Sequence, residues 1–319
     1  MSRETILSVS ELTVGYGEKA AVSQVSFSLY RGEILCLVGE SGCGKSTLLK
    51  SIMGTTPGLR VLSGSIELEG EPLTVMQEKQ RQKLCCSRIG MVFQDPGSSF
   101  NPIRSYRKQF IETLKSHGKY SPSDFDSRVG AAFAKLGLTD AKRILACCPY
   151  EMSGGMNQRI ALAVALLLGQ ELLLADEPTS ALDATIQLQV ALELRRLREQ
   201  SGVTQIVVTH NLALAKFLAD RIGVMYGGRL VELGDAADVL THPIHPYTRS
   251  LLAAIPSLDG HMPEGLPGQP PVTGPKAQGC EFCDRCPQCM PDCAAAAYTL
   301  RESAPGHLSS CILLEGGAQ

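Results

Sequence analysis

The feature that most constrains the fold is a glycine-rich run at residues 39–47, which reads GESGCGKST. It follows the wholly apolar pentapeptide ILCLV at residues 34–38 and leads into the helix-forming sequence KSTLLKSIM. A strand that is apolar throughout is buried on both faces, as the central strand of a parallel sheet is. A strand, a glycine loop and a helix in this order form the context in which GxxxxGK[ST] binds phosphate. The sequence therefore predicts an α/β nucleotide-binding fold.

The chemistry of phosphate binding assigns roles within this P-loop. Its glycines allow backbone N–H groups to turn toward the phosphates, Lys45 places a compact positive charge near the β- and γ-phosphates, and the Ser46 hydroxyl is a ligand for Mg²⁺. Cys43 is interpreted as a small spacer. We expect ATP and Mg²⁺ to be bound by Gly39, Ser41, Gly42, Cys43, Gly44, Lys45, Ser46 and Thr47.

A buried strand that ends in two acids, LLLADEP at residues 172–178, supplies the other half of a hydrolysis site. Phosphoryl transfer needs an acidic group that holds Mg²⁺ and a base that acts on the nucleophile. We expect Asp176 to hold Mg²⁺ through its water shell and Glu177 to polarise the attacking water.

The composition narrows the class of protein. The 319 residues include 44% hydrophobic ones and carry a formal charge of -2, which predicts a large globular domain with an appendage and gives no global signal for nucleic acid. The N-terminus does not resemble a secretory signal, so we expect a cytosolic chain. The most apolar stretch, residues 160–175, is interrupted by polar residues and is shorter than the ~20 residues that span a bilayer. Any membrane role therefore requires a partner.

Predicted elements alternate along the chain. Helices are expected at 153–168 and 184–200, and strands at 172–174 and 204–209, which indicates a parallel sheet covered on both faces. A Pro- and Gly-rich stretch without periodicity follows residue 255. The expected divisions are an ATPase domain at 1–250 with a helical subdomain at about 100–168, a strap at 251–279 and a cysteine-rich module at 280–319.

Further motifs resemble those of ATP-binding cassette (ABC) ATPases, in the family's order, from residue 6 to about residue 240. MSGGMNQR at residues 152–159 resembles the family's signature. The resemblance implies a P-loop ABC core, with a mixed sheet, an antiparallel β subdomain and a helical subdomain. It also implies four further site positions, which are the adenine-stacking Tyr16, the Q-loop Gln94 at the γ-phosphate and Mg²⁺, the D-loop Ser180–Asp183 and the switch histidine His210.

The signature also makes physical sense as a phosphate grip. Ser153 and the N–H groups of Gly154 and Gly155 lie at the expected start of a helix, where the positive end of the helix dipole attracts anions. The resemblance implies that this grip acts in trans on ATP held by a second subunit, so that ATP closes a dimer and hydrolysis opens it.

Other motifs resemble the ATPase subunits of bacterial dipeptide, oligopeptide and nickel importers. They are Met156 within the signature, FQDP followed by NP at 93–102, HPYT at 245–248 and PGQPP at 267–271. The resemblance implies import of peptides, nickel or a metal chelate, powered at the cytoplasmic face of the bacterial plasma membrane. The implied partners are a second, usually different, ATPase subunit, two transmembrane permease subunits docked by the helical region 101–146, and an extracytoplasmic substrate-binding protein.

Six cysteines lie between residues 280 and 311. The resemblance implies that four of them hold a [4Fe-4S] cluster, namely Cys280, Cys286, Cys293 and Cys311. A second ligand set competes, because Cys283, Cys286, Cys289 and Cys293 have the spacing of a bacterial ferredoxin run. Four thiolates also suit Zn²⁺. The sequence leaves these alternatives open.

Two other functions are compatible with an ABC core. Soluble ABC ATPases that act on nucleic acid duplicate the cassette or insert a long coiled coil, and this sequence does neither, so no nucleic-acid partner is expected. A redox-regulated ATPase would use the cysteine module as its sensor.

Overall fold

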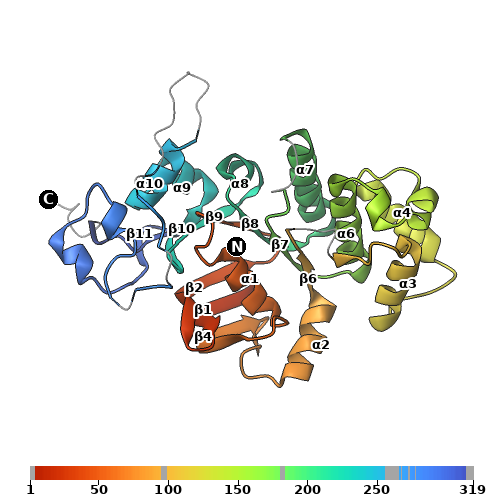
Figure 1. Cartoon of the computed structure of the whole chain (residues 1–319), viewed down its shortest axis with the longest axis horizontal. Helices are drawn as coiled ribbons and strands as arrows, with labels where there is room; N and C mark the ends of the chain where they lie inside the picture. The colour runs from red at the N-terminus through yellow and green to blue at the C-terminus, as the bar shows by residue number, and fades with distance from the viewer. Residues whose placement is uncertain are drawn as a thin grey trace. The chain divides into compact units, whose positions relative to one another are not determined.

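The computed structural model describes residues 4–94, 99–179, 184–255, 266, 268–271, 274–276 and 278–313 (Figure 1). The chain divides into two compact units. Unit 1 consists of Met1–Gln77 and Val208–Gln319, and unit 2 of Glu78–Val207. The expected D-loop, Ser180–Asp183, lies outside the described residues.

Unit 1 contains an antiparallel sheet near the N-terminus, drawn in red to orange in Figure 1. Long strands form because β-branched and aromatic residues alternate with polar ones and bury one face. This sheet is the antiparallel β subdomain that the resemblance implied. Its strands, in spatial order, are β2 (Lys19–Tyr30), β1 (Thr5–Tyr16), β4 (Leu59–Leu68) and β5 (Glu71–Pro72).

The other strands of unit 1 include the one that carries the P-loop. Strand β3 (Ile34–Val38) is buried at all five positions and pairs in parallel with β9 (Arg221–Tyr226). Burial on both faces confirms the prediction made from ILCLV. Beyond β9 the order continues with β10 (Arg229–Asp235), β12 (His307–Ser309) and β11 (Arg301–Ala304). The helices of this unit are α1 (Lys45–Met53), α8 (Leu212–Leu218), α9 (Ala236–Thr241) and α10 (Pro246–Ala253).

Unit 2 combines short parallel strands with a group of helices. Strand β6 (Ile89–Val92) pairs in parallel with β7 (Leu172–Asp176). On the other side of β7 lies β8 (Thr204–Thr209), whose last two residues belong to unit 1. The helices are α2 (Glu78–Arg88), α3 (Tyr106–Ser116), α4 (Phe125–Lys135), α5 (Ala141–Ala146), η2 (Pro149–Glu151), α6 (Gly154–Leu168) and α7 (Ala184–Ser201).

Aromatic side chains form the core of the helical part of unit 2. The Phe110 ring meets Tyr106 and Phe133 edge to face, with ring centroids 6.4 and 5.9 Å apart. All three rings are buried. Such contacts add about 0.5–1.5 kcal/mol each beyond the burial of apolar area. The contact of Phe110 with Phe133 therefore holds α3 against α4.

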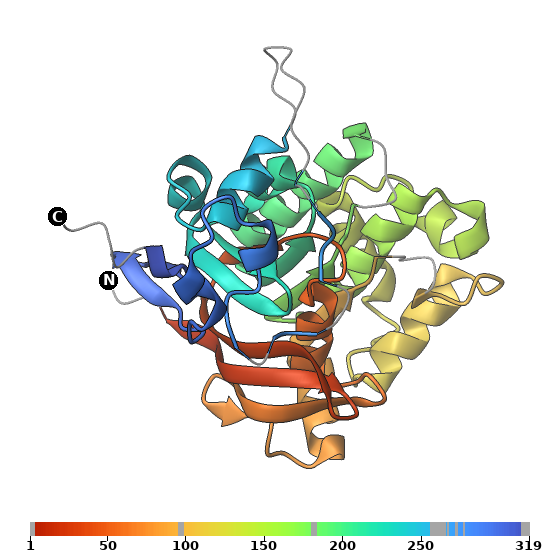
Figure 2. The same cartoon turned by 60° about the vertical axis from the view of Figure 1, so that its left-hand side comes forward.

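The cysteine-rich segment packs against the rest of unit 1. Strand β12 pairs antiparallel with β10, with Glu232 opposite Ser309. Phe282, 1% exposed, packs its ring edge-on against Tyr226 at 5.2 Å. Figure 2 brings this blue segment forward, with its short helices η3 (Cys283–Arg285) and η4 (Pro291–Ala294). Of the helices in the described part of the chain, none is long and apolar enough to cross a bilayer.

Candidate nucleotide site and cysteine cavity

The P-loop owes its path to its glycines. Gly39, Gly42 and Gly44 have φ of 149°, 82° and 101°, values that side chains with a Cβ rarely adopt. A Cβ on Gly39 would also lie 2.2 Å from the Met225 carbonyl oxygen. Helix α1 starts directly after Gly44, so its first N–H groups face the loop. This arrangement has the geometry of an anion cradle.

Lys45 is held inside the loop. Its Nζ donates to the carbonyl oxygens of Gly39 and Glu40, at 2.8 Å each, and lies 3.6 Å from Cys43 Sγ. Burial raises the pKa of the Cys43 thiol, and the nearby Lys45 charge opposes this rise only in part. The thiol is therefore protonated at neutral pH, as a spacer would be.

Glu40 is anchored by residues that the sequence analysis did not place in the site. Its backbone N–H donates to the Tyr247 hydroxyl at 2.9 Å. Its carboxylate accepts from Arg285 at 2.7 and 3.1 Å. One signal was available in the sequence, because a cation beside an acid in a phosphate-binding loop would offset the repulsion between that acid and the phosphates.

Tyr16 and His210 lie in the same unit as the P-loop. Tyr16 ends strand β1 and is 48% exposed, so its ring offers a face for stacking. His210 is exposed and comes directly after β8. The next residue, Asn211, caps α8 by accepting from the N–H groups of Ala213 and Leu214 at 3.0 and 3.2 Å. This cap fixes the backbone that carries His210.

The acidic pair and Gln94 lie in unit 2. Asp176, 5% exposed, is the last residue of β7, and Glu177 follows it with a left-handed backbone, φ 45°. Gln94 is exposed and follows β6, whose Val92 pairs with Ala175 of β7. Because carboxyl ends of adjacent parallel strands meet at one edge of a sheet, Gln94 and the acids lie at the same edge.

The signature residues form the exposed start of helix α6. Ser153 caps the helix, its Oγ accepting from the Met156 N–H at 3.3 Å. Ser153 and Gly154 are exposed, whereas Gly155 is buried and a Cβ there would meet Ile186 at 2.7 Å. The positive dipole end of this 15-residue helix is therefore exposed at Ser153 and Gly154.

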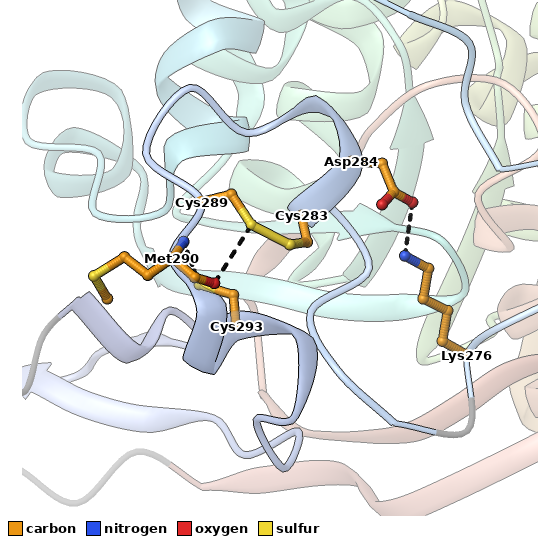
Figure 3. Close-up of a disulfide and its surroundings, with 6 residues drawn as sticks. All are labelled: Lys276, Cys283, Asp284, Cys289, Met290 and Cys293. Atoms are coloured by element: carbon orange, nitrogen blue, oxygen red, sulfur yellow. Dashed lines mark hydrogen bonds and ion pairs between the residues drawn. A yellow bond between two sulfur atoms is a disulfide. The ribbon is translucent and has the colours of Figure 1, made fainter.

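The cysteines of the C-terminal segment divide into two groups. Cys283 and Cys289 form a disulfide, with Cα atoms 5.3 Å apart (Figure 3). The other four are unpaired, and together with Cys283 they line one cavity. Burial raises the pKa of the Cys280 thiol to about 11, and the thiols of Cys293, Cys311 and Cys286 add to the rise. Within the described ranges, no three metal-ligating side chains converge closely enough to hold a single metal ion.

Two family models match the chain. The ABC transporter model matches residues 22–180, and the model for the C-terminal region of oligopeptide/dipeptide transporters matches residues 231–293.

Curated proteins match over nearly the full length. The oligopeptide transport ATP-binding protein OppD of Escherichia coli (strain K12) is 37% identical over 315 residues, which is 97% of this chain and 93% of OppD. The dipeptide transport ATP-binding protein DppD of Bacillus subtilis (strain 168) is 37% identical over 326 residues, which is 99% of this chain and 97% of DppD.

Solved structures match the fold. The cbiO1 protein of Clostridium perfringens, part of the ABC transporter complex cbiONQ, superposes with a TM-score of 0.66 at 25% identity, over 75% of this chain and 92% of its own. The ATP-binding cassette MJ0796 was solved as a dimer in a post-hydrolysis state with ADP and phosphate. It superposes with a TM-score of 0.64 at 26% identity, over 72% of this chain and 99% of its own.

Proposed function

Because the chain belongs to the ABC transporter family, among the oligopeptide and dipeptide transport ATP-binding proteins, we propose that it hydrolyses ATP to drive peptide uptake through a separate permease. The observation that carries this proposal is the match to OppD and DppD along both the ATPase core and the cysteine-rich tail. Its place is the cytoplasmic face of the membrane, where its partners are permease subunits and a substrate-binding protein.

The predicted site residues have separate roles in this mechanism. The P-loop N–H groups and Lys45 hold the β- and γ-phosphates, and the Tyr16 ring stacks on the adenine. Ser46, Gln94 and Asp176 would hold Mg²⁺, which would neutralise phosphate charge. Glu177 takes a proton from the attacking water, while Gln94 and His210 contact the γ-phosphate.

A second subunit completes the site in this proposal. The exposed N-terminus of α6, with Ser153 and Gly154 at its tip, supports a phosphate grip that acts on a neighbouring subunit. The ATP-binding cassette MJ0796 is itself dimeric with ADP and phosphate bound, which supports a dimer for this chain. We propose that ATP closes such a dimer, that hydrolysis opens it, and that the second subunit is a different ATPase.

Reconstitution in liposomes with the permeases encoded beside the gene tests the function. We expect a peptide-loaded binding protein to stimulate ATP hydrolysis. Lys45→Ala should lower the rate by about 100-fold or more, because it removes a charge from the transition state. Stimulation by nickel or a metal chelate but not by peptides would contradict the peptide assignment, and full activity of Lys45→Ala would contradict the nucleotide site.

The cysteine cavity supports a second proposal, which concerns the ligand set that the resemblance to the importer ATPases implied. We propose that Cys280, Cys286, Cys293 and Cys311 hold a [4Fe-4S] cluster. The bond between Cys283 and Cys289 takes two members out of the ferredoxin-like ligand set, and the four unpaired thiols line one cavity. Zinc requires four sulfurs at about 2.3 Å from one ion. Thiols spread around a cavity suit a larger cluster, which would supply a covalent link between four segments of the tail.

Purification without oxygen tests this ligand set. We expect brown protein with iron and sulfide, and loss of both in Cys293→Ser. The matched control is the double variant Cys283→Ser with Cys289→Ser, which should keep its iron. Colourless protein with one zinc per chain would favour the zinc alternative, and loss of iron in the control would favour the ferredoxin-like set.

A further inference from the structure

We propose that Arg285 is a positioning residue of the nucleotide site, which holds the P-loop in its phosphate-binding form through Glu40. ATP affinity then depends on a residue of the C-terminal cysteine module. The inference rests on the proposed role of the P-loop in binding phosphate.

The contact between Arg285 and Glu40 is bidentate and partly buried. Arg285 Nη1 donates to Glu40 Oε2 at 2.7 Å, and Nη2 donates to Oε1 at 3.1 Å. The two side chains are 5% and 23% exposed. A guanidinium and a carboxylate that meet through two parallel hydrogen bonds fix direction as well as distance. The pair therefore sets the orientation of the Glu40 side chain.

Both ends of this contact are themselves fixed. Arg285 Nη1 also donates to the Tyr226 hydroxyl at 3.2 Å. Arg285 ends the short helix η3, between the bonded Cys283 and the cavity-lining Cys286. Nearby, Phe282 is buried against Tyr226, so the guanidinium has little freedom to move.

Glu40 passes this constraint to the phosphate-binding atoms. Its backbone carbonyl accepts from Lys45 Nζ at 2.8 Å, and its N–H donates to Tyr247. The side chain, the N–H and the carbonyl of Glu40 are thus all hydrogen-bonded. The position of the Glu40 carbonyl in turn helps to fix the position of Lys45 Nζ. A shift of Glu40 would move the lysine that faces the phosphates.

Charge gives the expected sign of the effect. Glu40 puts a carboxylate inside a loop that receives a triphosphate, and like charges at short distance repel. Arg285 neutralises this carboxylate. Without Arg285 the loop would be less ordered and would repel ATP, so affinity would fall. Removing the Glu40 charge as well would remove the repulsion.

The test is a titration of the purified full-length chain with a fluorescent ATP analogue. We expect Arg285→Gln to bind the ATP analogue about tenfold more weakly, since truncating one partner of a partly buried charge pair is costly. Arg285→Lys keeps the positive charge but cannot form the bidentate contact. Its affinity for the ATP analogue should lie between those of the wild type and Arg285→Gln. The double variant Glu40→Gln with Arg285→Gln should return to within about threefold of the wild type, because the repulsive charge is gone.

A matched control comes from the same module. Lys276 and Asp284 form an ion pair at 2.8 Å that is 38% and 79% exposed, and Figure 3 shows it beside the disulfide. Lys276→Gln should leave ATP affinity unchanged. In the reconstituted transporter, Arg285→Gln should raise the KM for ATP and leave kcat nearly unchanged, because Arg285 does not touch the reacting atoms.

Three results separate the outcomes. Wild-type affinity of Arg285→Gln beside a loss of binding in Lys45→Ala would overturn the role of Arg285 and leave the proposed function standing. Normal binding by Lys45→Ala would overturn the proposed function itself. If Arg285→Gln does not fold, the ATP affinities of Arg285→Lys and of the double variant decide. Failure of the double variant to recover affinity would show that Arg285 supports the fold in general and does not act through Glu40, which would overturn the proposal.

Discussion

Glu177 has a left-handed backbone conformation, which few residues other than glycine adopt. Its φ of 45° lies in the left-handed region, which costs about 1–3 kcal/mol for a residue with a Cβ. Asp176 before it is buried at the end of β7. The turn after the strand therefore separates two adjacent carboxylates, leaving Asp176 in the sheet edge and Glu177 half-buried beyond it.

Glu177→Gln is the prediction at this scale. The amide keeps the shape of the side chain but cannot accept a proton, so hydrolysis should fall by about 100-fold or more while ATP binding remains. Phosphate release and a nucleotide titration measure the two quantities. Glu199→Gln, in an exposed pair with Arg195 on α7, should behave like the wild type. Undiminished turnover of Glu177→Gln would show that another group is the base.

Among the elements, α10 and the short helix η3 carry the attachment of the cysteine module to the core. Tyr247 of α10 is fully buried, and its ring centroid lies 4.5 Å from that of Tyr226 and 5.3 Å from that of Phe282. Arg229 and Glu281 form a buried ion pair at 3.1 Å, and Glu281 directly precedes Phe282 in the sequence. Apolar packing and a shielded charge pair together fasten η3.

Phe282→Ala tests this attachment. Loss of a buried ring costs about 3–5 kcal/mol, through lost burial and the cavity left behind. We expect the free energy of unfolding to fall by about that amount in a urea titration. Ile255→Ala, at a residue that is 37% exposed, should change it by less than about 0.5 kcal/mol. A similarly small change in Phe282→Ala would show that the module is held by other contacts.

For the whole molecule, the predicted site residues are distributed over two units. Tyr16, the P-loop and His210 belong to unit 1, whereas Gln94, the signature and the acids belong to unit 2. The signature lies at the exposed end of α6, and the proposed mechanism places it against a second subunit. The proposed mechanism therefore concerns an assembly of subunits rather than one chain.

The proposed dimer gives a prediction for Glu177→Gln at this scale. A variant that binds ATP without hydrolysing it should remain closed, because only hydrolysis opens the dimer. We expect size-exclusion chromatography with ATP to show twice the monomer mass, for the variant alone or mixed with the ATPase encoded beside it, and monomers without nucleotide. A monomer in the presence of ATP under both conditions would contradict closure in trans.

Local features of the sequence were sufficient for much of the fold. Short-range patterns predicted the buried strand β3, the start of α6 at Ser153 and a helix at 184–200, which the structure has as Ala184–Ser201. The Arg285 contact was not predicted, since it joins residues 245 positions apart. No periodicity or cap reports a contact at that distance.

The sequence by itself determined the family, the P-loop and the candidate hydrolytic residues, because these depend on residue types at fixed short spacings. Only the tertiary structure decided which cysteines bond and which line a cavity, since several spacings fit several ligand sets. It also decided that Glu40 of the P-loop is paired with the cysteine module. Several residues have the right chemistry to pair with Glu40 or with a given cysteine. Which of them does so depends on the packing of the whole folded chain.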